Sequence, residues 1–321
     1  MGACHATASF PFQADVFPFG FLLRIKSNHR GVIEIARETW SCFAPEFSAQ
    51  PLELHFIVSE ANAALCKPGT PPDAVFRAQN NLLVAVADAH NSALCDLRAG
   101  FGFAHLSETA VLDKNYLRYT FLEAIAYTLL DAQHVVAVHA ACVAKNGSGF
   151  LLFGESGAGK SSLAYACARQ GWTYISDDCA FLLRRASGRV ATGNPRTFRF
   201  RPAASTLFPE VKGPVSLRNG KHTIEIESAA LPSIKTAAEC TVNHVIFLNR
   251  CVQPDLRPLL RPVSQQECWR RISQQNAWPA ELCIEAERED VLKSLLGARA
   301  LQLNYAHCAQ AIEALDELAY T

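Results

Sequence analysis

The sequence predicts an α/β protein built from two domains. Its 321 residues exceed the usual size of one domain, and half of them are hydrophobic, which is enough for more than one core. From about residue 133 onward, short apolar strands alternate with amphipathic helices around a glycine-rich loop. We therefore expect a smaller mixed α/β domain over residues 1–132 and an α/β domain over residues 133–321.

In the N-terminal region, three stretches have the length and composition of strands, at 52–60, 81–89 and 101–106. Residues 31–43 place apolar side chains at helical spacing. A longer stretch, 115–132, carries one apolar stripe and predicts a helix that leads into the second domain. No catalytic motif occurs in this region.

The second domain is expected to begin with a β-hairpin. Residues 134–144 have the composition of a strand, and Asn146-Gly147 is a strong signal for a two-residue turn. Further along, the sequence predicts the strand 150–153, the helix 160–171, the strand 172–176, a hairpin around Ser187-Gly188, the strands 222–227, 242–249 and 301–304, and the helices 264–276 and 307–319.

Charge and composition argue against several classes of protein. The 30 basic and 30 acidic residues cancel, whereas nucleic-acid-binding domains usually carry a basic excess. No apolar run approaches the roughly 18 residues that a membrane-spanning helix requires, and the first residues do not resemble a signal peptide. We expect a cytoplasmic protein with no nucleic-acid or membrane partner, and the sequence leaves a homo-oligomer open.

The twelve cysteines point to the same compartment. None are spaced as CxxC, and none cluster with histidines at zinc-like spacing. Most lie in apolar segments, where a free cysteine behaves as a small hydrophobic residue. Reduced and buried thiols are therefore the expectation.

The glycine-rich loop carries the strongest chemical signal. GESGAGKS matches the P-loop (Walker A) pattern G-x-x-x-x-G-K-[ST] in full. Its glycines let backbone N–H groups turn toward an anion, and the following helix directs its N-terminal dipole to the same point. The Lys160 ammonium would reach the β- and γ-phosphates of a nucleotide, and the Ser161 hydroxyl would contact Mg²⁺. The predicted nucleotide-binding residues are Gly154, Glu155, Ser156, Gly157, Ala158, Gly159, Lys160, Ser161 and Ser162.

Two acidic residues, Asp177 and Asp178, end the strand after the loop's helix. In a parallel sheet this strand would lie beside the strand that leads into the loop, and its end would face the same crevice. One carboxylate could hold Mg²⁺ and the other could accept the proton of an acceptor hydroxyl. Their side chains should diverge because the backbone is extended there. A solvated turn followed by a helix cap is the alternative.

A histidine on the strand before the loop is a further candidate. Counting back antiparallel from the Asn146-Gly147 turn places His139 opposite Gly154, at the mouth of the loop. A shift of one residue would turn the imidazole to the opposite face. A histidine satisfied within the core is the alternative.

These residues resemble a known family. VHAACVAKNGSGFLLFGESGAGKSSLAYACARQGWTYISDD is similar to the catalytic domain of HPr kinase/phosphorylase and its HPr-kinase-like relatives. The family carries a histidine before the loop strand, a G-[DE]-S-G-x-G-K-S loop, and a strand ending in two aspartates. The close similarity covers residues 134–183.

The resemblance implies a P-loop kinase domain of the HPr kinase/phosphoenolpyruvate carboxykinase type, which uses ATP and Mg²⁺ to phosphorylate a serine hydroxyl. It implies that the aspartate pair supplies a general base and a metal contact. We favour Asp177 as the base and Asp178 as the metal contact, beside Ser161. The expected catalytic residues are Asp177, Asp178, His139 and Lys160.

The sequence departs from this family downstream of the aspartates. The Glu-Arg-Gly motif of HPr kinase/phosphorylase is absent, and the region reads GNPRTFRFRPAAS. The phosphorylase reaction and specificity for HPr are therefore not expected to follow. The region contains Arg196, Arg199 and Arg201, of which the last two share a strand face and could stabilise charge on a transferred phosphoryl group. A solvated edge strand is the alternative.

The favoured function is an ATP-dependent kinase acting on a hydroxyl, with a serine of a small protein or peptide as acceptor. Two alternatives stay open. The acceptor could be a small molecule such as free serine. The chain could also be a non-catalytic module that binds nucleotide and regulates a partner.

Overall fold

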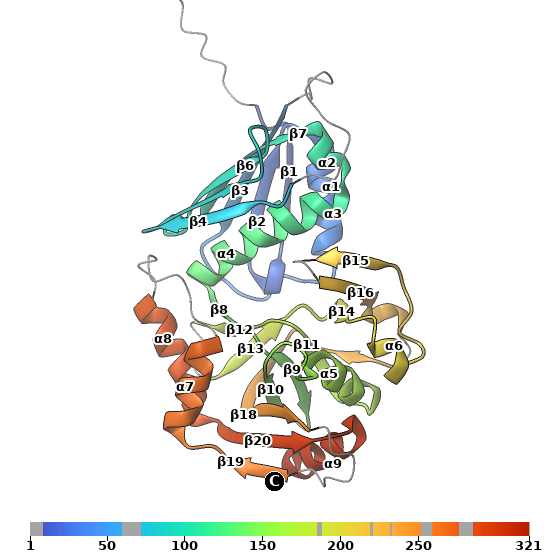
Figure 1. Ribbon diagram of the computed structural model, residues 1–321. Helices are drawn as coiled ribbons and strands as arrows, with labels where there is room; N and C mark the ends of the chain where they lie inside the picture. Colours follow the sequence, from blue (N-terminus) through green and yellow to red (C-terminus); the bar gives the residue numbers. More distant parts are fainter. Residues whose placement is uncertain are drawn as a thin grey trace, which may run out of the picture. The chain divides into compact units, whose positions relative to one another are not determined.

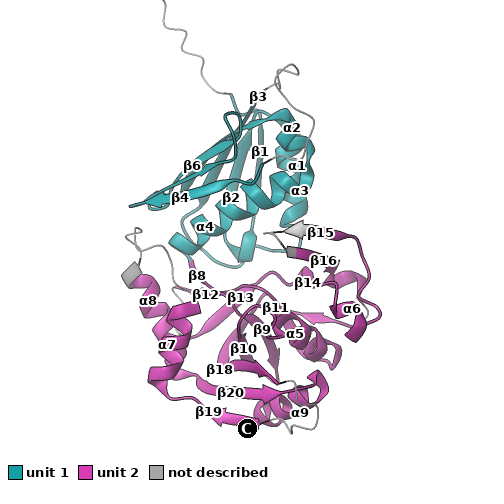
Figure 2. Cartoon of the chain, in the orientation of Figure 1, with its two compact units in different colours: residues 1–134, 278–285 teal, residues 135–277, 286–321 magenta. Residues whose placement is uncertain are grey.

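The computed structural model describes residues 9–59, 72–184, 188–218, 221–231, 233–251, 259–275 and 285–320. The chain separates into two compact units, residues 1–134 with 278–285 and residues 135–277 with 286–321 (Figure 2). Each unit combines helices with a mixed β-sheet, so the predicted α/β class is confirmed. Whether the predicted domains, 1–132 and 133–321, fold independently stays a prediction.

The first unit is built on a mixed seven-stranded sheet (Figure 1). Strands β2, β3 and β7 run parallel to one another in its middle, and all other neighbours pair antiparallel. In spatial order the strands are β1 (Phe12–Val16), β2 (Leu23–Ser27), β3 (Leu52–Ser59), β7 (Phe101–Ser107), β6 (Ser92–Asp96), β5 (Leu82–Val86) and β4 (Val75–Gln79).

Helices pack on this sheet because their apolar stripes need burial. Helix α1 contacts β1 and β2, and α4 contacts β3. The helix predicted over 115–132 is confirmed as a helical run whose middle part has wider, π-helical turns. The helical segments are Pro18–Gly20, α1 (Arg30–Thr39), α2 (Glu108–Leu112), α3 (Lys114–Tyr116), the π-helical segment Leu117–Glu123 and α4 (Ala124–Gln133).

The second unit contains a ten-stranded mixed sheet. The spatial order is β17 (Lys235–Thr236), β11 (Thr173–Ser176), β9 (Ala141–Lys145), β10 (Ser148–Phe153), β18 (Glu239–Arg250), β13 (Val190–Gly193), β12 (Ala180–Leu183) and β8 (Val135–Val138). Strand β20 (Arg299–Tyr305) also pairs with β18, and β19 (Leu259–Pro262) pairs with β20. Strands β10, β18 and β20 are parallel, so their carboxyl ends meet at one edge.

A smaller sheet and several helices complete this unit (Figure 1). The sheet has the order β14 (Thr197–Phe200), β16 (Lys221–Glu227), β15 (Val215–Arg218). The helices are α5 (Lys160–Arg169), α6 (Ala204–Leu207), α7 (Gln265–Gln275), α8 (Glu285–Ser294) and α9 (Cys308–Ala319), with short turns at Ser228–Ala230 and Leu295–Gly297.

Both faces of the ten-stranded sheet are covered. Alternate side chains of β10 point to opposite faces. Phe150 and Leu152 share one core with α5 and α9, whereas Leu151 and Phe153 share another with α7 and α8. This double burial explains why the strand before the loop is apolar at consecutive positions.

The predicted hairpin register is confirmed, but the predicted strand 134–144 is not one strand. Lys145 pairs with Ser148, and the ladder continues to Ala141 opposite Leu152. Before Ala141 the chain bends, because the N–H of Ala140 donates to the carbonyl of Val138 at 2.8 Å and closes a tight turn around His139. Strand β8 lies beyond this bend and pairs with β12 instead.

The expectation that the aspartate strand adjoins the loop strand is wrong. Strand β9 pairs antiparallel with both β10 and β11 and so lies between them. The hairpin partner takes one edge of β10, and β18 takes the other, so no edge is left for β11. Because β9 is antiparallel to both, β10 and β11 still run in the same direction and end at the same side of the sheet.

Among the described residues, no helix is both long and apolar enough to cross a membrane. The nine described cysteines form no disulfide, and four of them, Cys95, Cys142, Cys167 and Cys268, are buried. Burial raises the pKa of Cys95 to about 12 and that of Cys268 to about 11, so both stay protonated thiols.

Candidate active site

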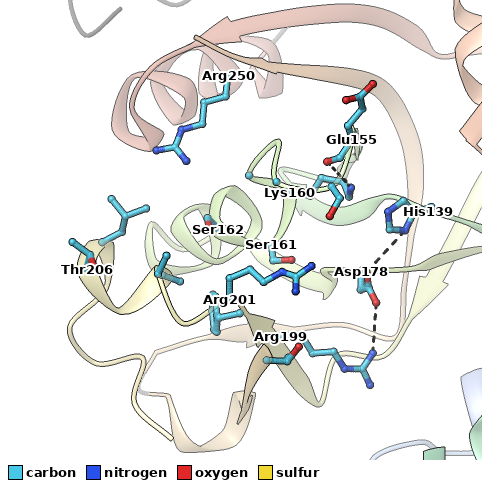
Figure 3. A pocket seen from close by; sticks show the side chains of 18 residues that line it. His139, Glu155, Lys160, Ser161, Ser162, Asp178, Arg199, Arg201, Thr206 and Arg250 are labelled. Atoms are coloured by element: carbon cyan, nitrogen blue, oxygen red, sulfur yellow. Dashed lines mark hydrogen bonds and ion pairs between the residues drawn. The ribbon is translucent and has the colours of Figure 1, made fainter. Parts of the chain in front are cut away.

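A cavity of about 860 Å³ opens at the carboxyl edge of the ten-stranded sheet in the second unit (Figure 3). The glycine-rich loop and the start of α5 form one wall, and the end of β14 with α6 forms another. Its lining residues are His139, Glu155, Ser156, Gly157, Gly159, Lys160, Ser161, Ser162, Asp178, Arg199, Phe200, Arg201, Ala203, Ala204, Thr206, Leu207, Thr223 and Arg250.

The loop's glycines adopt conformations that other residues avoid. Gly157 and Gly159 have φ angles of +90° and +95°, and a side chain on Gly154 would lie 2.8 Å from the Cβ of Ala158. A Cβ on Gly157 would meet no atom within 4 Å, so the loop encloses open space on that side. The backbone thus turns tightly between β10 and α5 and leaves room for a ligand against it.

Lys160 and Ser161 begin the helix α5 behind this loop. Lys160 is 8% exposed, and its ammonium donates to the carbonyl oxygens of Gly154 at 2.6 Å and Glu155 at 3.3 Å. The Ser161 hydroxyl donates to the Asp177 carbonyl at 3.4 Å. The loop, its lysine and its serine therefore lie at one wall of the cavity, together with Ser162.

The two aspartates diverge, as the extended backbone predicts, and only one of them reaches the cavity. The Asp177 side chain is buried, with 4% of the residue exposed, and its Oδ2 accepts the backbone N–H of Arg199 at 2.6 Å. Burial raises its pKa to about 7, although the Arg199 N–H and guanidinium oppose this shift. Asp177 is absent from the cavity lining.

Asp178 lies in the cavity with its side chain 54% exposed. Its Oδ1 is 4.0 Å from the Nδ1 of His139, and its Oδ2 is 3.9 Å from the Nη1 of Arg199 (Figure 3). The Asp178 carboxylate thus lies close to both a histidine and an arginine within the cavity.

His139 reaches the cavity by a different route from the one expected. The hairpin count placed it as a ladder partner of Gly154, but the ladder ends at Ala141. The bend at His139 instead turns the imidazole into the cavity, where it is half-exposed beside Asp178 (Figure 3).

Of the three candidate arginines, two line the cavity and one does not. Arg199 and Arg201 both line the cavity, as their shared strand face predicts, and the Nε of Arg199 also lies 3.4 Å from Glu225. Arg196 forms an ion pair with Glu227 at 3.0 Å and does not line the cavity.

Sequence reasoning missed Arg250 and the segment around α6. Arg250 is the last residue of β18, which runs parallel to the loop strand, and its side chain lines the cavity (Figure 3). The signal was available, since the strand predicted over 242–249 ends just before this arginine and strand ends face the ligand crevice. Nothing in the sequence around Thr206 and Leu207 marks them.

Among the described residues, no group of three or more His, Cys, Asp or Glu side chains forms a metal cage. Ser161 and Asp178, on the same cavity, offer a hydroxyl and a carboxylate. Mg²⁺ is commonly held by one or two carboxylates together with phosphate oxygens and water, and this donor set suits it. The site as a whole is chemically suited to a phosphate-bearing ligand.

Comparison with known proteins adds two findings. The family model of SynChlorMet cassette protein ScmC matches residues 104–216, a segment that includes the loop, α5 and both aspartates. No curated protein matches the sequence. Among solved structures, the Hpr(Ser) kinase/phosphatase from Coxiella burnetii is similar with a TM-score of 0.31 and 15% identity, over 57% of this chain and 90% of that chain. It is a distant neighbour, and the family model that matches is not that of an HPr kinase.

Proposed function

We propose that this chain is a Mg-ATP-dependent phosphotransferase that phosphorylates a hydroxyl, with a P-loop kinase domain of the HPr-kinase-like type. One observation carries the proposal: most of the phosphate-loop motif, including Gly159, Lys160 and Ser161, lines the same cavity as the Asp178–His139–Arg199 group. A nucleotide-binding loop alone is compatible with many functions, whereas a carboxylate and a histidine facing it suit proton removal from an acceptor.

The loop residues hold the phosphates. Backbone N–H groups of residues 154–159 and the start of α5 would bind the anion. The Lys160 ammonium, which here bonds loop carbonyls, would bind phosphate oxygens instead. Ser161 would hold Mg²⁺ together with phosphate oxygens and water. Bound Mg-ATP would supply the γ-phosphoryl group.

Asp178 is the carboxylate that faces the acceptor. Its side chain is open to the cavity and lies beside His139, so it can accept the proton of a hydroxyl positioned there. The role of base, favoured for Asp177 on sequence, requires contact with the acceptor. We therefore give Asp178 the role of base in place of the metal contact expected for it. Asp177 is assigned to positioning, since its carboxylate holds the backbone of Arg199.

Arg199 and Arg201 stabilise negative charge on the transferred group. Both lie on the wall opposite the loop's lysine, and Arg201 projects into the middle of the cavity (Figure 3). Two guanidinium groups held in the cavity would stabilise the negative charge that develops on the phosphoryl group during its transfer.

Labelled phosphoryl transfer tests the proposal. The purified chain is incubated with γ-labelled ATP, Mg²⁺ and three acceptor classes: free serine, serine-containing peptides and small proteins. We expect label on a serine hydroxyl of the peptide or protein class. Asp178→Asn should lower turnover by roughly 100-fold or more, because it removes the proton acceptor. Asp15→Asn, in a surface ion pair of the first unit, is the matched control and should leave turnover unchanged.

The outcomes separate the alternatives. Transfer to free serine alone would make the acceptor a small molecule. ATP binding with no labelled acceptor would favour a regulatory nucleotide-binding module. A greater loss from Asp177→Asn than from Asp178→Asn would return the base role to Asp177.

A further inference from the structure

We infer that Tyr305 is a positioning residue for the glycine-rich loop: its hydroxyl orients the peptide bond between Ala158 and Gly159 so that the Gly159 N–H points into the cavity. The inference rests on the proposed function, because it concerns how that loop binds a nucleoside triphosphate. It adds a residue 144 positions beyond the loop motif, counted as 305 − 161.

Tyr305 is firmly held. It is the last residue of β20, is 1% exposed, and packs in the core that α5 and α9 share. Its backbone pairs with Arg250 across the parallel β18–β20 ladder, and its carbonyl accepts the N–H of Cys251 at 2.8 Å. The ring therefore approaches the loop from a fixed strand end.

Its hydroxyl meets the loop at one peptide bond. The Oη of Tyr305 donates to the carbonyl oxygen of Ala158 at 2.8 Å. A Cβ on Gly159 would lie 2.5 Å from the Oη of Tyr305, so a side chain at position 159 would displace the tyrosine ring. The positive φ of Gly159 and this close approach both require glycine.

The orientation of the peptide follows from its planarity. In a trans peptide the C=O and N–H bonds point in opposite directions. The Ala158 carbonyl points to the buried Tyr305, while Gly159 lines the cavity. Holding the carbonyl on the tyrosine therefore directs the Gly159 N–H toward the ligand space.

The chemistry favours a tyrosine rather than a phenylalanine at this position. A buried hydroxyl requires a hydrogen-bond partner, and the Ala158 carbonyl provides one. Burial also raises the pKa of Tyr305, so the hydroxyl stays protonated and remains a donor. The N–H groups of the loop can then bind the phosphate oxygens of a nucleotide without first reorganising the loop backbone.

Titration calorimetry with Mg-ATP and with tripolyphosphate tests the inference in the full chain. Tyr305→Phe removes only the hydroxyl, and we expect both ligands to bind about three- to tenfold more weakly, the effect of one lost hydrogen bond. Tyr165→Phe is the matched control, since it removes another core tyrosine hydroxyl, bonded to Glu210 at 2.9 Å and away from the loop. It should change affinity less than twofold.

Two further readouts separate positioning from general packing. The amide resonance of Gly159 should shift in Tyr305→Phe and should remain in place in Tyr165→Phe. In a double-mutant cycle, Gly159→Ala should weaken binding more when the tyrosine hydroxyl is present than when Tyr305→Phe has removed it.

The failures are distinguishable. If the wild type binds neither Mg-ATP nor tripolyphosphate, the proposed function is overturned together with the inference. If the wild type binds both, and Tyr305→Phe binds as tightly or loses no more affinity than Tyr165→Phe, only the positioning role is overturned.

Discussion

The two large sheets of this protein bury their strands differently. In the first unit, buried residues alternate with partly or fully exposed ones along β3 and β5, and Leu82, Val84 and Leu94 remain exposed on one face. In the second unit, Phe150, Leu151, Leu152 and Phe153 are all buried, because helices cover both faces. The first pattern is typical of a sheet with one covered face, and the second of parallel strands between helix layers.

The polar residues at the strand ends also behave differently. In the first unit, the parallel strands β2, β3 and β7 each end in a serine. Each of these serines forms a hydrogen bond with another residue of the first unit. Ser27 accepts the N–H of His29, Ser59 bonds His105, and Ser107 bonds Asn91. In the second unit, the corresponding edge holds the glycine-rich loop and Arg250 against an 860 Å³ cavity. Polar residues at strand ends therefore indicate a site only where they face open space.

The largest expected effect contrasts a lysine from each unit. If the proposed function holds, Lys160→Ala should lower phosphoryl transfer by about 1000-fold, because it removes a buried cation from the glycine-rich loop. Lys26→Ala removes a lysine that pairs with Glu53 at 3.3 Å in the first unit and should leave transfer unchanged. Initial rates with labelled ATP measure both variants. Equal losses would show that the cavity in the second unit is not the reaction site.

The next effect contrasts two leucines in strands. Leu152→Ala, in the doubly covered sheet, should lower the free energy of unfolding by about 3 kcal/mol, since it leaves a cavity in a packed core. Leu94→Ala, at a position that is 49% exposed, should change it by less than about 0.5 kcal/mol. Urea denaturation followed by circular dichroism gives both values. A comparable loss at Leu94 would mean that the open face is covered in solution.

A third effect, smaller per pH unit than the loss expected for Leu152→Ala, concerns the buried Asp177. Its folded pKa of about 7 lies above the ordinary carboxyl value of 3.8, so the folded state binds one more proton than the unfolded state between these limits. Stability should therefore fall as pH rises from about 4 to 7, by at most about 1.4 kcal/mol per pH unit from this group.

Asp177→Asn should remove that part of the slope, because the amide does not ionise in this range and its oxygen can still accept the Arg199 N–H. Denaturation at several pH values, without nucleotide or Mg²⁺, compares the two proteins. Asp15→Asn, at the surface of the first unit, serves as the control. Parallel curves for wild type and Asp177→Asn would contradict the raised pKa.

Local sequence signals predicted the local structure well. The Asn146-Gly147 turn predicted the hairpin register, and the spacing of the apolar residues predicted α5 and β18. Arg199 and Arg201 share the cavity as their alternation predicts. These features depend on contacts between residues near one another in the chain, so composition and spacing are sufficient.

Long-range arrangement was predicted less well. The strand predicted over 134–144 breaks at His139, because β8 pairs with β12 rather than continuing the hairpin. The aspartate strand β11 is separated from β10 by β9. Neither outcome is visible in the sequence, since both depend on which strand edges other segments have already occupied.

The sequence by itself determined the chemistry available to this protein: a glycine-rich loop with its lysine and serine, a pair of aspartates at a strand end, and a histidine, His139, shortly before the hairpin. Only the tertiary structure decided which of these groups share one space. It buries Asp177 on the Arg199 backbone, opens Asp178 to the cavity, adds Arg250 to the cavity wall, and places Tyr305 against a loop far away in the chain. The reason is physical: a side chain's type is a local property, whereas its burial and neighbours depend on how distant strands pair and pack.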